Sequence, residues 1–319
     1  MLQYLIILLA DDSTSYCHYD TPGAQGKLIS LEHLEAGVRL AMMENLMIQF
    51  VYPDYDLPLA YKKVIESTDH SKIIPSTSPI AEKADVIVIN HWEEFKVNRF
   101  DTSAAYVLRI PMRDLLVQGK LIKLILHHAS RLNIVITDVE RCTDEDLSAY
   151  DSLLRDFAKT VKRIFTTGQQ TQLNVLTDRL MLSQMNNCNA GDENITLAAD
   201  GRLYVCPAFY YSTEDKDAFC VGTLKEGINI KAGHLYKLGS SPLCRRCDAY
   251  QCKRCIWLNR KTTLDITTPS HEQCTMAHVE RNASWRLLKS IRRHGDYFPD
   301  IQLEKTDYLD PFDVRIISN

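Results

Sequence analysis

The chain has 319 residues, of which 45% are hydrophobic and 24% are charged, as is ordinary for a folded globular protein. This length suits one domain of about 200 residues followed by a smaller one. The formal net charge of −4 provides no general attraction to nucleic acid or to an anionic membrane. The sequence therefore predicts neither nucleic acid nor a membrane as a partner.

The chain opens with an apolar run at residues 2–9 that leads directly into Asp11-Asp12. The run lacks the basic flank and the small-residue cleavage site of a signal peptide, and it is too short to cross a bilayer. We expect it to be a buried parallel strand. We also expect the protein to be cytoplasmic, where thiols stay reduced and clustered cysteines serve metals more often than disulfides.

Apolar runs of strand length alternate with segments of helical periodicity up to residue 183. The expected strands are residues 2–9, 47–51, 72–75, 84–90, 104–110, 132–138 and 173–176. The expected helices are residues 31–45, which Ser30 can cap, and residues 57–67, 112–131 and 144–165. Such alternation predicts an α/β fold with a parallel sheet, open or closed as a partial (β/α) barrel.

The carboxyl ends of parallel strands are where sites form in such folds. The side chains expected there are Asp11, Asp12, Tyr52, Asn90, His91, Arg109 and Asp138. Capping of a loop or a helix is the simpler role for each of them and is the one we expect. The region contains no phosphate-binding loop, no G-x-G-x-x-G and no G-x-S-x-G motif.

Cysteine is concentrated in one stretch of the sequence. Eight of the ten cysteines lie between Cys188 and Cys274. Within this stretch, Asp200-Gly201 between two apolar segments predicts a hairpin that brings Cys188 and Cys206 toward one end of a ribbon. Two C-x-x-C pairs follow, and 18 residues separate the second pair from the last cysteine. Paired C-x-x-C units of this kind indicate a metal-binding domain.

The spacing between the two C-x-x-C pairs bears on which metal they hold. Zinc ribbons separate their pairs by about 15–20 residues, whereas only four residues lie between Cys247 and Cys252. This short spacing favours two separate centres. Basic residues surround the cysteines and could balance the negative charge of iron–sulfur clusters, or simply form a solvated face. Zinc remains the alternative, and disulfides are disfavoured by the missing signal segment.

The cysteine pattern resembles the SPASM domain of radical-SAM peptide-modifying enzymes. That domain has a cysteine, roughly nine to fifteen residues, a glycine, four residues and a second cysteine, and then a group of five cysteines. Cys188, Gly201 and Cys206 fit the first half with intervals of 12 and 4 residues. In the second half, the usual intervals of about five and three residues are four and two here.

The resemblance implies two [4Fe–4S] clusters. The ligands of one would be Cys244, Cys247, Cys252 and Cys274. The ligands of the other would be Cys188, Cys206 and Cys255, with Cys220 as a candidate fourth. An iron left open to a substrate is the alternative to that fourth ligand.

The α/β region resembles the partial barrel of radical-SAM enzymes, with one departure. Those enzymes hold their catalytic cluster with C-x₃-C-x₂-C in the loop after the first strand. The corresponding loop here, residues 11–19, contains Cys17 as its single cysteine and cannot supply three thiolates. S-adenosylmethionine is therefore not expected as a cofactor, and catalytic residues cannot be assigned.

Over its length the chain is similar to the CXXX repeat peptide maturase family, as judged from residues 2–12, residues 47–54 and the cysteine region. This resemblance implies a degenerate radical-SAM-like barrel at residues 1–183, a SPASM-like cluster domain at 184–274 and a C-terminal helix and tail at 275–319. The expected partners are a cysteine-rich precursor peptide and a radical-SAM maturase.

Three functions stay open at this point. The first is a companion subunit that docks the peptide or relays electrons. The second is an enzyme in its own right that uses an open auxiliary cluster or Cys17. The third is a zinc-stabilised structural or interaction protein.

Overall fold

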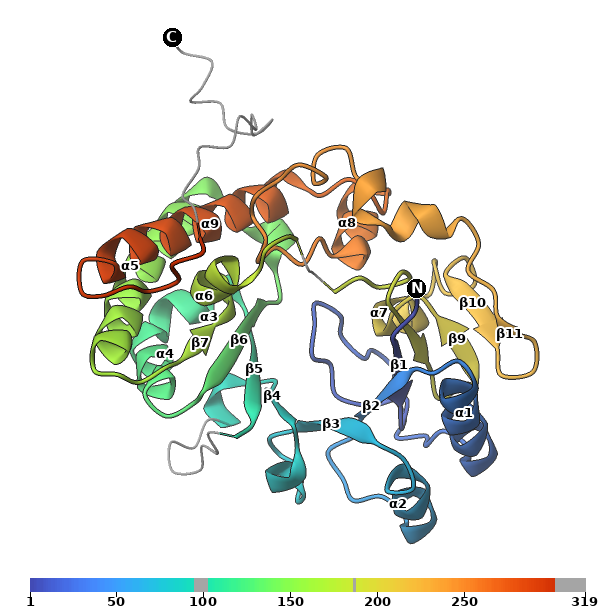
Figure 1. Ribbon diagram of the computed structural model, residues 1–319. Helices are drawn as coiled ribbons and strands as arrows, with labels where there is room; N and C mark the ends of the chain where they lie inside the picture. The colour runs from blue at the N-terminus through green and yellow to red at the C-terminus, as the bar shows by residue number, and fades with distance from the viewer. Residues whose placement is uncertain (95–102, 186–187, 302–319) are drawn as a thin grey trace. The chain divides into compact units, whose positions relative to one another are not determined.

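The computed structural model describes residues 1–94, 103–185 and 188–301 (Figure 1). The chain forms two compact units. The first unit comprises residues 1–94, 106–109 and 189–237, and the second unit comprises the remaining described residues. Each unit combines segments that are distant in sequence. The domain boundaries after residues 183 and 274 stay a prediction.

The first unit is built on a sheet with β1 near its middle. Four strands run parallel in chain order: β1 (Tyr4–Leu8), β2 (Met47–Val51), β3 (His70–Pro75) and β4 (Val86–Ile89). Beyond the other edge of β1 come β8 (Asn194–Leu197), β9 (Arg202–Tyr204), β10 (Cys220–Thr223) and β11 (Gly227–Ile228). β8 is parallel to β1, and the last three strands are antiparallel. Leu5 and Ile7 are fully buried, which explains the apolar run.

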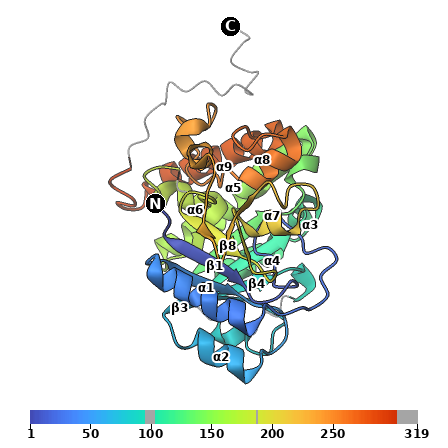
Figure 2. The same cartoon turned by 90° about the vertical axis from the view of Figure 1, so that its right-hand side faces the viewer.

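Helices of the first unit lie beside this sheet. They are α1 (Leu31–Met43), α2 (Leu59–Ile65) and α7 (Pro207–Tyr211), with short 3₁₀ turns η1 (Ala81–Lys83), η2 (Trp92–Glu94) and η5 (Gly233–Tyr236). As predicted, the Ser30 hydroxyl caps α1 by accepting from the amide of His33 at 3.1 Å. α1 packs against β1, β2 and α2 (Figure 2). A Cβ on Gly37 would lie 2.3 Å from Leu197, so glycine lets α1 approach β8 closely.

The hairpin predicted at Asp200-Gly201 is confirmed, because β8 and β9 pair antiparallel around it. Gly201 has φ +80°, a conformation that favours glycine. The Tyr204 hydroxyl donates to the Asp200 carboxylate at 2.7 Å, and this side-chain hydrogen bond stabilises the turn.

Among the described residues, the second unit contains a pair of parallel strands and the longest helices. β6 (Arg131–Ile136) pairs parallel with β7 (Gln172–Leu173). The helices are α3 (Met112–Val117), α4 (Gly119–Leu126), α5 (Asp144–Thr166), α6 (Asn174–Met181), α8 (Ile256–Thr263) and α9 (His271–Ile291), and the 3₁₀ turns are η4 (Val139–Arg141) and η6 (Leu238–Ser240). β5 (Ala105–Ile110) has residues 106–109 in the first unit. None of the helices in the described part of the chain is long and apolar enough to cross a membrane.

The structure corrects the predicted helix over residues 112–131. Two helices, α3 and α4, meet at Gln118, and the chain enters β6 at Arg131. Gly119 stands at the break, where a Cβ would lie 2.7 Å from Leu153 of α5. Close packing against α5 therefore requires glycine at position 119, and glycine disfavours a continuous helix there.

The predicted strand at residues 173–176 is also wrong beyond Leu173, because α6 begins at the next residue. The Leu173 amide donates to the Thr177 hydroxyl at 2.9 Å. The Asn174 side chain exchanges two hydrogen bonds of 2.9 Å with the backbone of Ile134. These polar contacts turn the chain into a helix despite its apolar composition.

A buried ion cluster connects the cysteine loop of the second unit to α6 and α9. Asp248, only 3% exposed, accepts from Arg281 Nη1 at 2.8 Å and lies 3.7 Å from Arg179 Nη2. The Arg179 guanidinium stacks 4.2 Å above the ring of Tyr250. Two cations therefore hold one buried carboxylate between the two C-x-x-C pairs.

We expect the substitution Asp248→Asn to lower the free energy of unfolding by about 3–5 kcal/mol, because it leaves two cations without their buried counter-charge. Urea unfolding followed by circular dichroism measures this change. As a control, Asp56→Asn removes an exposed ion pair to Lys62 and should leave stability nearly unchanged. Equal effects of the two substitutions would contradict the structural role of Asp248.

α5 and α9 also share a buried carboxyl group. Glu280 on α9 accepts from the Tyr150 hydroxyl at 2.9 Å and from the side-chain amide of Gln251 at 3.5 Å. Burial raises the pKa of Glu280 from 4.5 to about 7 and outweighs the opposing effect of these hydrogen bonds.

Because the pKa of Glu280 is higher in the folded than in the unfolded state, its contribution to stability is full below pH 4.5 and is lost as the pH rises through 7. The loss amounts to about 3 kcal/mol by pH 8. We expect Glu280→Gln to remove this loss, so that the variant gains stability relative to the wild type between pH 5 and pH 8. Urea unfolding at several pH values tests this, and parallel pH profiles would contradict it.

Candidate functional site

A cleft of about 640 Å³ lies in the first unit, at the carboxyl ends of its parallel strands. Its lining includes Asp12, Thr14, Asp20, Asp54, Asn90, His91, Glu94 and Arg109. Four of the side chains predicted at strand ends, those of Asp12, Asn90, His91 and Arg109, therefore line one cleft, as expected for a parallel sheet.

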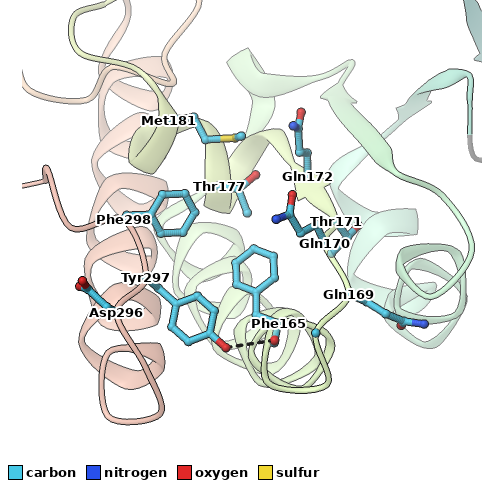
Figure 3. Close-up of a pocket in the computed structure, with 11 residues that line it drawn as sticks. Phe165, Gln169, Gln170, Thr171, Gln172, Thr177, Met181, Asp296, Tyr297 and Phe298 are labelled. Atoms are coloured by element: carbon cyan, nitrogen blue, oxygen red, sulfur yellow. Dashed lines mark hydrogen bonds between the residues drawn. The ribbon is translucent and has the colours of Figure 1, made fainter.

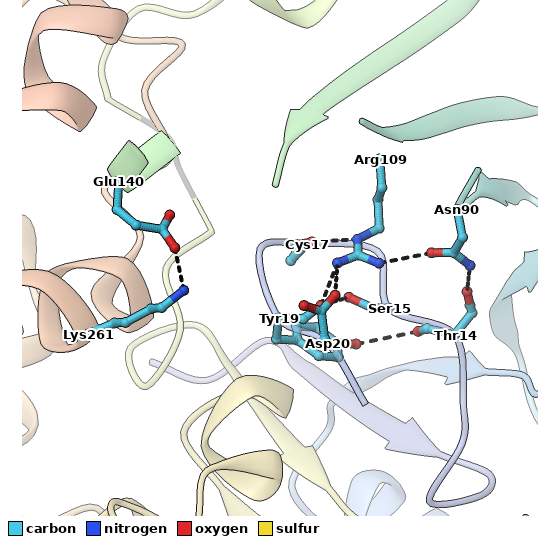
Figure 4. A network of polar contacts seen from close by, with 9 residues as sticks. All are labelled: Thr14, Ser15, Cys17, Tyr19, Asp20, Asn90, Arg109, Glu140 and Lys261. Carbon is cyan, nitrogen blue, oxygen red and sulfur yellow. Dashed lines mark hydrogen bonds and ion pairs between the residues drawn. The ribbon is translucent and has the colours of Figure 1, made fainter. Parts of the chain in front are cut away.

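The guanidinium of Arg109 organises this cleft. Arg109 is 8% exposed and donates from Nε to the carbonyl oxygen of Cys17 at 2.8 Å. Its Nη2 donates to the carbonyl of Tyr19 and to the carboxylate of Asp20, both at 2.7 Å. Its Nη1 donates to Asn90 Oδ1 at 3.0 Å (Figure 4). Four directional bonds from one planar cation thus fix the loop after β1.

Asn90, which follows β4, makes a further hydrogen bond in this network. Asn90 Nδ2 donates to the hydroxyl of Thr14 at 2.9 Å (Figure 4). The hydroxyl of Ser15 donates to the carbonyl of Tyr19, which closes the loop on itself. The loop is therefore held from two strand ends, by Asn90 after β4 and by Arg109 in β5.

The two aspartates after β1 have different roles. Asp11 accepts from the amides of Lys27 and Gln25 at 2.8 and 3.3 Å, which is a loop-capping role. Asp12 accepts from the hydroxyl of Tyr55 at 3.1 Å and lines the cleft. Burial raises the pKa of Asp12.

The remaining strand-end candidates have mainly structural roles. The ring of Tyr52 is 4% exposed. Asp138 belongs to the second unit, where its carboxylate accepts from the amide of Met112 at 2.8 Å and caps α3. The simpler capping interpretation therefore holds for Asp11 and Asp138, whereas Arg109 and Asn90 do more than the sequence indicated.

The second unit has a smaller pocket of about 370 Å³ near the end of α5. Apolar side chains of Phe165, Met181, Tyr297 and Phe298 line it, together with amide side chains such as Gln172 (Figure 3). The Tyr297 hydroxyl donates to the carbonyl of Phe165 at 3.1 Å and holds one wall. Of its lining residues, Asp296 alone carries a carboxylate, so the pocket suits apolar contact better than acid–base chemistry.

The cysteine loop of the second unit contains backbone donors aimed at sulfur. The amide of Ala249 lies 3.4 Å from Cys247 Sγ, and the amide of Arg254 lies 3.3 Å from Cys252 Sγ. In both cases the donor comes two residues after the cysteine, as in turns that stabilise thiolate ligands. Arg254 adopts φ +41° to make this turn, and its Nη1 donates to Ser241 at 2.8 Å.

Burial disfavours the charged form of these thiols. It raises the pKa of Cys244 to about 11 and that of Cys252 well above its usual value. A cationic metal centre would restore the thiolate form, as metals do for coordinating thiols. The N–H···S turns at Cys247 and Cys252 therefore suit metal-bound thiolates.

The other predicted ligands are divided between the units. Cys206 and Cys220 lie in the first unit, whereas Cys188 and Cys255 lie in the second, together with Cys274 of α9. Among the residues that the structure describes, no three histidine, cysteine, aspartate or glutamate side chains converge as metal ligands do. Both ligand sets stay predictions.

Sequence reasoning missed His278. This residue of α9 is 5% exposed, and its Nε2 lies 3.4 Å from Cys247 Sγ. A signal for it was present, since Cys274 and His278 are four residues apart and share one face of a helix. The structure places both residues in α9, which begins at His271 after its cap Ser270, earlier than the C-terminal segment predicted from residue 275.

No family model matches the chain, and no curated protein is significantly similar to it in sequence. Solved structures do match. Hexahistidine-tagged anSMEcpe with bound AdoMet superposes with a TM-score of 0.60 at 13% identity, over 94% of this chain and 98% of that one. Native anSMEcpe with AdoMet and Kp18Cys peptide gives 0.59 at 13% identity, over 91% and 99%. anSMEcpe is a radical-SAM and SPASM anaerobic sulfatase maturase. The α/β fold predicted from the sequence is therefore confirmed, and it is similar to the fold of this maturase.

We expect Arg109→Lys to loosen the loop after β1, because an ammonium cannot make four directional bonds in one plane. Backbone amides at residues 13–20 should exchange with deuterium faster, and the free energy of unfolding should fall by about 2 kcal/mol. Hydrogen exchange followed by mass spectrometry measures the first effect. Arg39→Lys on the exposed side of α1 is the control. Unchanged exchange in the loop would show that Arg109 does not hold it.

Proposed function

We propose that the chain is an iron–sulfur-binding component of a ribosomal peptide modification system in the cytoplasm. It acts as companion to a radical-SAM maturase on cysteine-repeat peptides, as its resemblance to the CXXX repeat peptide maturase family implies. One observation carries the proposal. The fold is that of a radical-SAM maturase, yet the loop after β1 has a single cysteine and is closed by Arg109.

The cysteine region supplies the thiolate ligands for iron–sulfur clusters that the loop after β1 lacks. Cys244, Cys247, Cys252 and Cys274 are assigned to one [4Fe–4S] cluster, and all four belong to the second unit. Cys188, Cys206 and Cys255 are assigned to another, with Cys220 as a candidate fourth ligand. Such clusters supply one-electron transfer when bound. The chain's own contribution is the set of amide donors that favour the thiolate form of Cys247 and Cys252.

A peptide is the proposed partner of this fold. Two of the similar structures are anSMEcpe with Kp18Cys or Cp18Cys peptide, the latter at a TM-score of 0.58. The cleft of the first unit, about 640 Å³ in volume, is large enough for a few side chains of such a peptide. AdoMet accompanies the peptide in those structures. We do not assign it to this chain, because its loop cannot supply three thiolates.

A zinc-stabilised interaction protein is the second candidate. A thiolate and an imidazole bound to one tetrahedral zinc lie about 3.5 Å apart. The 3.4 Å between Cys247 Sγ and His278 Nε2 matches that separation. Ligands on different irons of one [4Fe–4S] cluster lie farther apart, so this contact favours zinc or a hydrogen bond.

Iron, zinc and acid-labile sulfide content distinguish these functions. We expect about eight irons and eight sulfides per chain after anaerobic reconstitution, with a band near 400 nm that dithionite bleaches. Cys244→Ser combined with Cys247→Ser should lower iron by about half, whereas Cys142→Ala, outside both ligand sets, should leave it unchanged. Zinc without sulfide would exclude the iron–sulfur function and support the second candidate.

A further inference from the structure

A basic groove runs between α5 and α9 of the second unit and encloses about 730 Å³. Its cations are Arg155, Lys159, Lys162 and Arg163 of α5 and Arg286 of α9. Ala283 and Leu287, both 1% exposed, form part of its floor. The groove therefore has cationic walls, and the aliphatic stems of its lysines and arginines supply its accessible apolar surface.

Helical spacing explains why the cations are side by side. Lys159 follows Arg155 by four residues, and Arg163 follows Lys159 by four, so all three share one face of α5. The lining continues to Thr166, so the groove follows α5 for about 16 Å. An extended peptide covers that length with about five residues.

Local carboxylates balance only part of this charge. Asp151 accepts from Arg155 at 2.8 Å and also from Arg286, so one carboxylate serves two cations. Lys159 lies 3.8 Å from Asp156, which pairs more closely with Lys123. Within the described part of the chain, no carboxylate pairs with Lys162 or Arg163.

A favourable interaction with the carboxyl end of α5 does not explain why all these cations lie along the helix. A cation in the last turn of a helix interacts favourably with its carboxyl end, and Arg163 meets that condition. Arg155 and Lys159 lie more than one turn before that end, where the effect has vanished. This basic groove is also local, since the chain as a whole carries a net charge of −4.

We propose that the groove docks an acidic segment of the peptide partner. The choice of a peptide as partner rests on the proposed function, whereas the acidic character rests on the groove itself. Cations without a carboxylate partner, whose aliphatic stems line the groove, suit carboxylates interspersed with apolar side chains. A nucleic acid fits less well, because the rest of the chain carries net negative charge that repels its phosphates.

The test uses a fluorescein-labelled 12-residue peptide of alternating glutamate and leucine, and fluorescence anisotropy with the full chain. We expect binding that weakens between 50 and 300 mM salt and that falls about tenfold in Lys162→Glu combined with Arg163→Glu. The matched control is Lys62→Glu combined with Lys63→Glu, an adjacent basic pair on α2 of the first unit, which should change binding less than about twofold.

Three outcomes would overturn the proposal. One is equal loss in both double variants, which indicates nonspecific attraction. Another is tighter binding of a single-stranded oligonucleotide of equal charge. The third is unaltered peptide binding in the Lys162/Arg163 variant. Iron content, circular dichroism and thermal unfolding of the same samples verify folding and keep this result separate from the test of the iron–sulfur function.

Discussion

The Arg109 guanidinium is the interaction on which the first unit's site depends. It reaches from β5 into the loop after β1 and satisfies two backbone carbonyls, one carboxylate and the amide of Asn90. A planar cation that is only 8% exposed cannot leave this position without stranding those acceptors. Unlike the three-thiolate loop of radical-SAM enzymes, the loop after β1 has one cysteine and is held by Arg109, and the cleft beside it offers carboxylates, hydroxyls, an imidazole and an amide. This difference is why we propose a companion role rather than an ordinary radical-SAM reaction.

The second unit depends on a comparable constraint. Asp248 sits between the two C-x-x-C pairs and is held by Arg179 and Arg281, so the loop that contains the cysteines is tied to α6 and α9. α9 also presents His278 to Cys247 and Glu280 to Gln251. The chemistry of the thiols is thus set by residues well outside the cysteine pattern, as outer contacts commonly set the properties of metal ligands. Whether iron or zinc occupies this loop decides between the two proposed functions.

Much of the fold could be predicted from the sequence because local and global preferences agree there. The apolar run of β1, the cap of α1 by Ser30 and the hairpin at Gly201 each follow from a period, a capping residue or a turn. The breaks at Gln118 and after Leu173 could not be predicted, because they depend on Leu153 and Ile134, which are distant in sequence. The convergence of Arg109 on Cys17 and Tyr19 depends on contacts across about 90 residues, which no spacing rule reports.

The central claim of the proposed function is that this chain, whose fold is similar to that of anSMEcpe, has no S-adenosylmethionine chemistry of its own. Formation of 5′-deoxyadenosine tests it most directly, with anaerobically reconstituted protein, S-adenosylmethionine and dithionite in excess. We expect no product above the level of a protein-free sample, while the iron of the reconstituted chain stays bound. Formation of one or more equivalents of 5′-deoxyadenosine per chain would contradict the claim and assign a catalytic cluster to a chain that has Cys17 alone in its first loop.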